Sequence, residues 1–308
     1  MTAILLNEPA GFPPEAVQRL AKLGPVYRAD QLYPAEAITA VLVRLREKIG
    51  AEFLQRHPAL RWVVSPTTGV DHLDLARFEQ AGVQVICLRG RTAFLDHIHA
   101  TAEHTLALLL ALVRHIPAAV QDVSRGAWNR YPFQGSELHG KTVLILGYGR
   151  IGRQVHALYT AFGCRVLAHD SVAGKVPPEL QAPWPDAMGE ADIVSVHVSL
   201  DEGTRGLVDA AMLDRCKPGA LLVNTSRGEI LDQAALLARV ADGRLGGAAL
   251  DVLTDEPQPL DATLLQLIAR CGPRLLITPH IAGFTAESLG VVENHVADLL
   301  VAAVQAAG

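Results

Sequence analysis

A cation, a carboxylate and an imidazole each stand shortly after an apolar run of this chain. They are Arg227, Glu256 and His280. Short apolar runs predict strands, and the carboxyl ends of parallel strands meet at one edge of a sheet. Taken singly, each residue has an ordinary explanation: a solvated loop arginine, a turn residue before proline, and a histidine satisfied by its neighbours. Together they would place a proton donor, a carboxylate and a fixed positive charge on one rim.

A glycine motif precedes these residues in the chain. The apolar run 143–146 suits a buried strand, and the residues after Gly152 suit a helix. Gly147 permits a tight turn, Gly149 lets the backbone approach a pyrophosphate, and Gly152 lets helix and strand pack closely. The helix N-terminus then offers N–H groups to phosphate. Asp170, at the end of the next apolar run, can accept both ribose hydroxyls of NAD and would repel the 2′-phosphate of NADP, so the pattern predicts a dinucleotide site that favours NAD.

The dinucleotide motif and the three polar residues together indicate one reaction, the reduction of a 2-keto acid. Hydride transfer from a nicotinamide to the keto carbon places negative charge on the keto oxygen, where a proton and a fixed cation must meet it. His280 can supply the proton, and a carboxylate at Glu256 favours the imidazolium. Arg227 presents a planar fork that matches a substrate carboxylate in two hydrogen bonds.

The order of apolar runs predicts how these residues are positioned. The first hundred residues alternate short apolar runs with helical stretches, which predicts a parallel sheet. A helical stretch, 101–114, precedes the glycine motif, and the final segment, 288–306, could fold back onto the first domain. We predict an α/β fold of two doubly wound parallel sheets, with 1–98 plus 285–308 as one domain and 99–284 inserted into it. The runs interpreted as strands are 4–6, 40–43, 62–64, 83–86, 143–146, 165–169, 193–198, 220–224, 247–250 and 275–278.

The composition excludes several classes of protein. Half of the 308 residues are hydrophobic and the net charge is −5, so no basic surplus indicates a nucleic-acid partner. The four cysteines form no CxxC pair, which argues against a zinc site or a disulfide framework and favours a reducing compartment. The longest apolar stretch, 105–113, is too short to cross a bilayer, and the N-terminus lacks a basic signal-peptide start. We expect a cytoplasmic protein without a membrane partner.

At this point the chain resembles the D-isomer-specific 2-hydroxyacid dehydrogenase family, which includes phosphoglycerate dehydrogenases and glyoxylate or hydroxypyruvate reductases. The resemblance runs nearly end to end. It implies an NAD-binding Rossmann domain inserted into a flavodoxin-like substrate domain. The motifs that carry it are TGVD at 68–71, TAEH at 101–104, GYGRIG at 147–152, KPGALLVNTSRGEILD at 217–232, GAALD at 247–251, EP at 256–257 and PHIAG at 279–283.

The resemblance also implies roles for individual residues. Arg227 would bind the substrate carboxylate and keto oxygen, His280 would be the acid/base, and Glu256 would hydrogen-bond the histidine. The backbone of residues 68–70 would face substrate, Asp251 would lie near the nicotinamide carboxamide, and the family commonly forms homodimers through its cofactor domains. The implied substrate-binding residues are Thr68, Gly69, Val70, Arg227 and His280, and the implied cofactor-binding residues are Gly147, Gly149, Arg150, Ile151, Gly152, Asp170, Thr225, Ser226, Arg227, Asp251, His280 and Gly283.

The chain departs from the family pattern in three places. Ser171 follows Asp170 where proline is common, and a small polar residue there can tolerate a 2′-phosphate. Ser199 replaces the usual proline two residues after His197. The loop 87–102 is longer than the family's usual short loop and is expected near the domain cleft, so it leaves the identity of the substrate open.

Two groups of side chains in and near this loop each allow two interpretations. A polar helix start is favoured over a metal site, because the two loop histidines could share a face only on a strand; we predict no metal. Solvated arginines are favoured over a subsite for a distal anionic group of the substrate. The residues considered for a metal site are His97, His99, Glu103 and His104. The residues considered for an anion subsite are Arg44, Arg89 and Arg91.

Two other functions remain as alternatives. The first is a nicotinamide-sensing binding protein, like the corepressors that resemble this family, in which turnover is incidental. The second is a formate or phosphite dehydrogenase, which is disfavoured because formate oxidation needs no such proton relay and no asparagine-rich formate site is evident.

Overall fold

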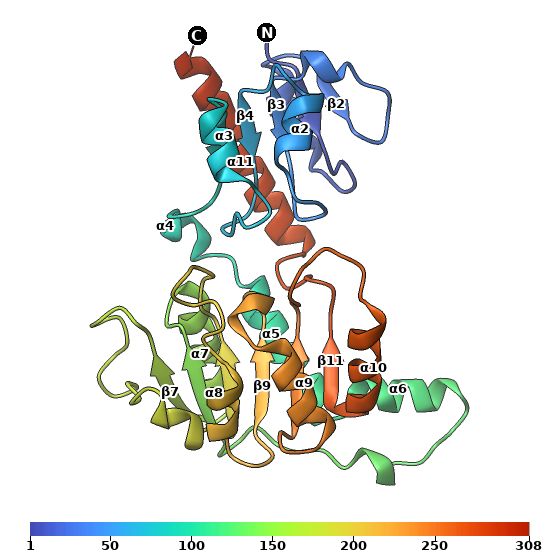
Figure 1. The fold of residues 1–308 in the computed structure, drawn as a ribbon, viewed down its shortest axis with the longest axis vertical. Helices are drawn as coiled ribbons and strands as arrows, with labels where there is room; N and C mark the ends of the chain where they lie inside the picture. The colour runs from blue at the N-terminus through green and yellow to red at the C-terminus, as the bar shows by residue number, and fades with distance from the viewer. Residues whose placement is uncertain (308) are drawn as a thin grey trace. The chain divides into compact units, whose positions relative to one another are not determined.

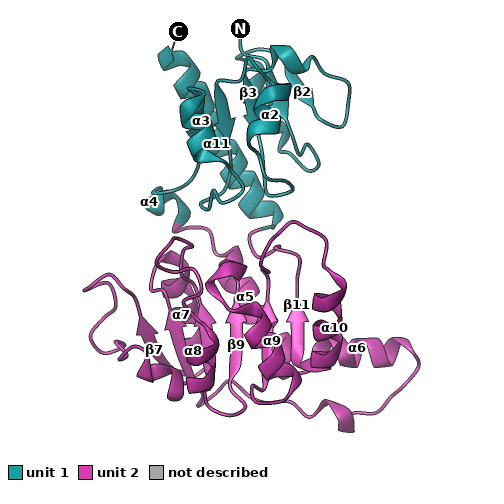
Figure 2. Cartoon of the chain, in the orientation of Figure 1, with its two compact units in different colours: residues 1–95, 284–308 teal, residues 96–283 magenta. Residues whose placement is uncertain are grey.

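The computed structural model describes residues 1–307 and divides into two compact units (Figures 1 and 2). Unit 1 comprises Met1–Leu95 together with the chain from Phe284 onward, and unit 2 comprises Asp96–Gly283. The chain therefore leaves unit 1, builds unit 2 and returns to unit 1 for its last helix. Each unit has its own sheet.

Unit 1 is built on a parallel sheet in the order β2-β1-β3-β4-β5, which is the flavodoxin-like order. Leu5, Val41 and Val63 lie at the centres of their strands and pack on the side of α2 and α3. Their strand neighbours point to the other face, where α1 and α11 pack. The elements are β1 (Ile4–Leu6), α1 (Pro14–Ala21), β2 (Val26–Arg28), η1 (Ala35–Ala37), β3 (Ala40–Leu42), α2 (Ala51–Arg56), β4 (Trp62–Val64), α3 (Leu75–Gln80), β5 (Gln84–Ile86), α4 (Thr92–Leu95) and α11 (Ala286–Ala307).

Helix α11 is long and apolar enough to cross a membrane by length and composition alone, as are α5 and α6 if they are taken as one bent span. In the structure, α11 instead contributes Val292, Val296 and Leu300 to the core of unit 1. It packs against α1, β4 and β5. Its apolar face is therefore explained by packing on the sheet.

Unit 2 is built on a parallel sheet in the order β11-β10-β9-β8-β6-β7. Along β6, Val143 and Ile145 pack on the side of α5 and α7, whereas Leu144 and Leu146 pack on the side of α8 and α9. Both faces are thus covered, as a parallel sheet requires. The elements are α5 (Ala100–Val113), α6 (Ile116–Ser124), η2 (Tyr131–Phe133), β6 (Thr142–Leu146), α7 (Arg150–Ala161), β7 (Arg165–His169), η3 (Asp186–Gly189), β8 (Ile193–Val196), α8 (Ala210–Arg215), β9 (Leu221–Asn224), η4 (Gly228–Ile230), α9 (Gln233–Ala241), β10 (Gly247–Leu250), α10 (Ala262–Cys271), η5 (Gly272–Arg274) and β11 (Leu275–Ile277).

The two sheets confirm the predicted class, an α/β fold of two doubly wound parallel sheets. In unit 2 the strand order reverses between β6 and β8, and ligands of such sheets bind at the carboxyl ends of strands at this point. Three helices of unit 2 begin at aspartates whose side chains accept a backbone N–H, which fixes where the loops end: Asp209, Asp232 and Asp261.

The sequence-based prediction omitted one strand and misplaced the ends of several strands and helices. β2 was not expected, because Val26–Arg28 is short and lies at the sheet edge with half-buried or exposed side chains. The run 193–198 was expected to be one strand, but β8 stops at Val196. α7 begins at Arg150, inside the glycine motif, and not after Gly152.

Candidate active site

The register of the unit 2 sheet brings the ends of β9, β10 and β11 side by side. Asn224 pairs with Leu250, and Leu250 pairs with Ile277. Arg227 follows the first of these strand ends and His280 follows the last. In the structure, the loops that carry Arg227, Glu256 and His280 therefore begin at one edge of one sheet, as the sequence predicted.

His280 and Glu256 are in direct contact. His280 Nδ1 lies 2.6 Å from Glu256 Oε2, and the other carboxylate oxygen of Glu256 accepts the Leu253 N–H. Both side chains are partly exposed, with 25% of the His280 side chain and 31% of the Glu256 side chain accessible. Because a carboxylate only accepts hydrogen bonds, Nδ1 donates, and Nε2 is the ring nitrogen left for a substrate.

Asp251 shapes the backbone that carries His280. The Asp251 carboxylate is fully buried and accepts the Thr278 hydroxyl at 2.6 Å, the Ile281 N–H at 2.9 Å and the Ala282 N–H at 2.8 Å. The Asp251 carbonyl also accepts the His280 N–H at 2.8 Å. These bonds hold His280 at a φ of 54°, a left-handed conformation that is unusual for histidine and is found at functional sites.

Arg227 lies in a loop tied down by Asn224. The buried Asn224 side chain accepts the Ser226 N–H and hydroxyl at 2.9 and 2.6 Å and donates to the Arg227 carbonyl at 2.8 Å. Arg227 Nη1 donates to the Ser226 carbonyl at 2.7 Å. At Gly228, an added Cβ would lie 2.1 Å from the Leu253 carbonyl carbon. Glycine is therefore needed there for the Arg227 loop to touch the loop that holds Glu256.

The glycine motif forms a cradle between β6 and α7. Gly147 has a φ of 90°, and a Cβ there would lie 2.6 Å from the His197 carbonyl oxygen. A Cβ on Gly152 would lie 2.1 Å from the Gly147 oxygen, whereas one on Gly149 would meet nothing within 4 Å. The open space at Gly149, at the N-terminus of α7, fits a dinucleotide pyrophosphate.

The side chain of Arg150 is directed away from this cradle. Its Nη1 donates to the Ile98 carbonyl at 2.9 Å, and burial lowers the pKa of its guanidinium. Gln154 binds the same carbonyl at 3.1 Å. The Arg150 side chain therefore holds the segment before α5. If Arg150 and Ile151 bind the pyrophosphate, as the resemblance implies, they would do so through their backbone N–H groups.

Asp170 is bound to the cradle. Its Oδ2 accepts the Tyr148 N–H at 2.8 Å and contacts Lys175 Nζ at 2.8 Å, and its Oδ1 accepts the Val172 N–H at 3.0 Å. Burial alone would raise the pKa of Asp170, but these three donors outweigh it and hold that pKa below its usual range. Asp170 is thus a carboxylate beside the pyrophosphate cradle, where a ribose would lie.

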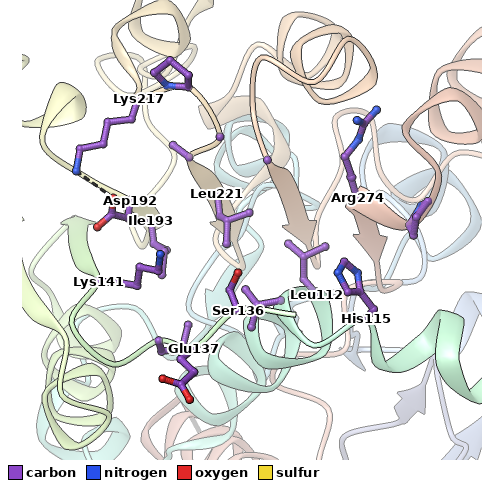
Figure 3. Close-up of a pocket in the computed structure, with 17 residues that line it drawn as sticks. Leu112, His115, Ser136, Glu137, Lys141, Asp192, Ile193, Lys217, Leu221 and Arg274 are labelled. Atoms are coloured by element: carbon purple, nitrogen blue, oxygen red, sulfur yellow. Dashed lines mark hydrogen bonds and ion pairs between the residues drawn. The ribbon is translucent and has the colours of Figure 1, made fainter. Parts of the chain in front are cut away.

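A pocket of about 330 Å³ lies at the opposite edge of the unit 2 sheet (Figure 3). It is lined by the end of α5 and by residues at or just before the starts of the strands, and Figure 3 shows Lys141 and Lys217 on one side and Arg274 and His115 on the other. Lys217 is paired with Asp192 at 3.0 Å. Among the described residues that line it, none belongs to the predicted catalytic or cofactor-binding set, so this pocket is separate from the candidate site.

Comparison with known proteins places the chain in a family. Residues 106–282 match the model of the D-isomer specific 2-hydroxyacid dehydrogenase NAD binding domain. The chain belongs to this dehydrogenase family. A (S)-sulfolactate dehydrogenase from Chromohalobacter salexigens is 35% identical over 270 residues, which cover 85% of this chain and 83% of that protein.

Two further known proteins are similar to this chain. A D-3-phosphoglycerate dehydrogenase from Mycobacterium tuberculosis is 37% identical over 254 residues, covering 81% of this chain and 46% of that protein. This chain thus spans about half the length of the phosphoglycerate dehydrogenases it matches. The structure of D-lactate dehydrogenase from Aquifex aeolicus, complexed with NAD and lactic acid, has a TM-score of 0.81 and 25% identity, covering 99% of this chain and 96% of that chain.

Several polar residues without an assigned role in the sequence support the candidate site. His104 Nε2 lies 3.1 Å from Thr278 Oγ1 and 3.3 Å from Asp251 Oδ1, so α5 reaches the His280 loop. The Thr105 hydroxyl lies 2.8 Å from that of Thr225, one of the implied cofactor residues. The signal for the first contact was the TAEH motif at 101–104, which carried the resemblance without an assigned function.

In the sequence, His197 was mentioned only because Ser199, two residues later, replaces the proline usual in the family. Its Nε2 lies 2.7 Å from the Ser195 hydroxyl, which is 3.0 Å from the Tyr159 hydroxyl. Burial lowers the pKa of His197 to about 3. The residue whose carbonyl lies against Gly147 therefore carries a neutral imidazole.

The implied substrate residues Thr68, Gly69 and Val70 lie in unit 1, in the loop after β4. The Thr67 hydroxyl donates to the Gly69 carbonyl at 2.6 Å and lies 2.8 Å from the Ser65 hydroxyl. The loop is thus ordered by its own side chains. Its implied role toward substrate stays a prediction.

Arg44 and the loop histidines have specific surroundings. Arg44 is not a solvated loop residue, since its side chain is 12% exposed and its Nη2 lies 2.5 Å from Oε1 of the buried Glu293 side chain. His97 and His99 are exposed. Within residues 1–307, no group of three or more His, Cys, Asp or Glu side chains could hold a metal ion.

Proposed function

We propose that the protein is an NAD(H)-dependent dehydrogenase that reduces a 2-keto acid to the D-2-hydroxy acid. The observation that carries this proposal is the 2.6 Å contact between His280 Nδ1 and Glu256 Oε2, on loops that start at the same sheet edge as the loop of Arg227. Membership of the dehydrogenase family supports the same reaction class. The alternative of a nicotinamide-sensing binding protein would not require this proton donor.

Each of the three side chains has one task in this reaction. Arg227 binds the substrate carboxylate and directs the keto oxygen toward His280. His280 donates its Nε2 proton to that oxygen as the oxygen becomes an alkoxide, and Glu256 keeps the imidazole oriented. The bound dinucleotide supplies the hydride to the keto carbon. One hydride and one proton together convert the ketone to a hydroxyl group.

Two observations support the cofactor and the substrate class. A ribose next to the cradle would meet the Asp170 carboxylate, which accepts hydroxyls and repels a 2′-phosphate, so NAD is the proposed cofactor. The named relatives act on phosphoglycerate and sulfolactate, acids with a second anionic group. We therefore include substrates with such a group in the test.

The test is an NADH-oxidation screen of the purified chain with glyoxylate, hydroxypyruvate, pyruvate, phenylpyruvate and 3-phosphohydroxypyruvate, repeated with NADPH. We expect at least one keto acid to be reduced, faster with NADH. Tight NADH binding with no reduction of any keto acid would favour the binding-protein alternative. Absence of both binding and reduction would refute the proposal.

A further inference from the structure

We propose that Lys175 weakens the preference of this site for NAD over NADP, by placing an ammonium group next to the position of the ribose 2′ substituent. The inference rests on the proposed function, because it assumes that the glycine cradle binds a dinucleotide. Sequence reasoning assigned nothing to Lys175. The structure places its Nζ 2.8 Å from Asp170 Oδ2.

A short turn after β7 brings Lys175 back over Asp170. The Val172 N–H binds Asp170 Oδ1 at 3.0 Å, and the Lys175 N–H binds the Val172 carbonyl at 3.3 Å. Gly174 has a φ of 76°, which lets the chain reverse. The next residue, Val176, is buried in the core of unit 2. The position of Lys175 is thus built by the loop and anchored after it.

The Asp170 carboxylate is already close to saturated with donors. Its Oδ2 contacts the Tyr148 N–H and the Lys175 ammonium, and among the described residues its Oδ1 accepts the Val172 N–H. A carboxylate offers about four acceptor sites, so about one remains for the two hydroxyls of a ribose. Two of the donors are backbone groups, whereas the Lys175 side chain is 37% exposed. Lys175 is therefore the donor that must yield when a ribose binds.

A displaced Lys175 ammonium stays near the ribose. Donors that share one carboxylate lie within about 5 Å of each other, so the ammonium and the ribose 2′ oxygen become neighbours. A 2′-phosphate there would meet the positive charge of Lys175 as well as the negative charge of Asp170. The exposed Ser171, a small residue, leaves room beside Asp170. Repulsion of NADP by Asp170 is thus offset by attraction to Lys175.

The test compares binding of ADP-ribose and 2′-phospho-ADP-ribose by calorimetry, because these ligands lack the nicotinamide and report no catalysis. The variant is Lys175→Met, which keeps the apolar stem and removes the charge. We expect its affinity for the 2′-phosphorylated ligand to fall about fivefold or more, with ADP-ribose binding unchanged or tighter. Lys175→Arg should keep the wild-type ratio. Arg165→Met, at the other end of β7, removes the same charge from an exposed pair with Glu190 and should leave the ratio unchanged.

The outcomes separate this inference from the function on which it rests. If wild-type protein binds both ligands and Lys175→Met leaves their affinity ratio unchanged, or weakens both equally, Lys175 is only a structural partner of Asp170 and the inference is overturned. If wild-type protein binds neither ligand, the dinucleotide site itself is refuted, and the inference with it.

Discussion

The imidazole of His280 and the carboxylate of Glu256 meet across two loops, with Nδ1 2.6 Å from Oε2. Each partner is held independently. The Glu256 carboxylate also accepts the Leu253 N–H, and the His280 backbone is bound by Asp251. The orientation of the imidazole is therefore fixed from both sides, which is what a directed proton transfer requires.

Replacing His280 with Gln should abolish most of the catalysis and spare cofactor binding. Gln retains a polar side chain of similar reach but cannot deliver a proton. We expect kcat for keto acid reduction to fall by about 10³-fold. The dissociation constant for NADH, measured by fluorescence titration, should change less than about twofold. Retention of more than a tenth of the wild-type kcat would show that another group donates the proton.

Replacing Glu256 with Gln should slow the reaction less severely. The amide oxygen can still accept from His280 Nδ1, but the hydrogen bond that orients the imidazole is no longer strengthened by a negative charge. We expect kcat to fall by about ten- to a hundredfold with KM nearly unchanged. Asp255→Asn is the matched control, because it removes one negative charge from the adjacent, exposed position. Equal decreases in kcat for the two substitutions would show that Glu256 acts only through its negative charge and not through its hydrogen bond to His280.

The sequence predicted the parts of the site that depend on local pattern. The glycine cradle is encoded within six residues. Arg227 and His280 were singled out because both follow apolar runs, which form β9 and β11 on either side of β10 in one parallel sheet. The fold class followed from the same alternation of runs and helices. Strand ends were less accurate, since apolar residues such as Val198 continue beyond the last ladder hydrogen bond.

Other contacts between distant segments could not be predicted. Arg44 was interpreted as a solvated or substrate-binding residue, but its partner Glu293 lies 249 residues away. The involvement of Asp251 in the backbone of 280–282 depends on the turn after β11, which no local motif encodes. Lys175 was missed because only the fold of its turn brings it to Asp170.

The glycines of the cradle offer a paired prediction. A Cβ at Gly149 meets nothing within 4 Å, so Gly149→Ala should keep the wild-type melting temperature while weakening NADH binding by about tenfold or more, because the methyl occupies the space of the pyrophosphate. A Cβ at Gly152 overlaps the Gly147 carbonyl oxygen, so Gly152→Ala should destabilise the protein by about 2 kcal/mol or more. Calorimetry of melting and of NADH binding measures both. Normal NADH affinity in Gly149→Ala would contradict the cradle.

Glu293 should make stability depend on pH. Burial raises the pKa of Glu293 to about 7, although Arg44 opposes the shift. The folded protein then keeps a proton that the unfolded chain releases near its ordinary pKa of 4.5. Stability from this group is therefore complete below that value and is lost as the pH rises toward 7, a loss of up to about 3 kcal/mol.

The substitution Glu293→Gln should remove this dependence. Urea denaturation at about pH 4.5 and about pH 8 measures the free energy of unfolding at the lower end of this window and above its upper end. We expect the wild-type free energy to decrease more over this interval than that of Glu293→Gln. Glu287→Gln, an exposed position on the same helix, should retain the wild-type slope. Identical slopes in all three proteins would show that Glu293 is already ionised at the lower pH.

Helix α6 leads to a prediction about oligomeric state. Ile116, Val120 and Val123 lie at helical spacing and are 47%, 64% and 52% exposed, and Figure 1 shows α6 extending away from the sheet of unit 2. An exposed apolar stripe on a protruding helix is typical of an interaction surface. We propose that a second copy of the chain covers it in a homodimer. Val120→Glu should then shift sedimentation from dimer to monomer, while Gln121→Glu, which adds the same charge outside the stripe, should leave the dimer intact. A wild-type chain that sediments as a monomer at all concentrations would refute the homodimer.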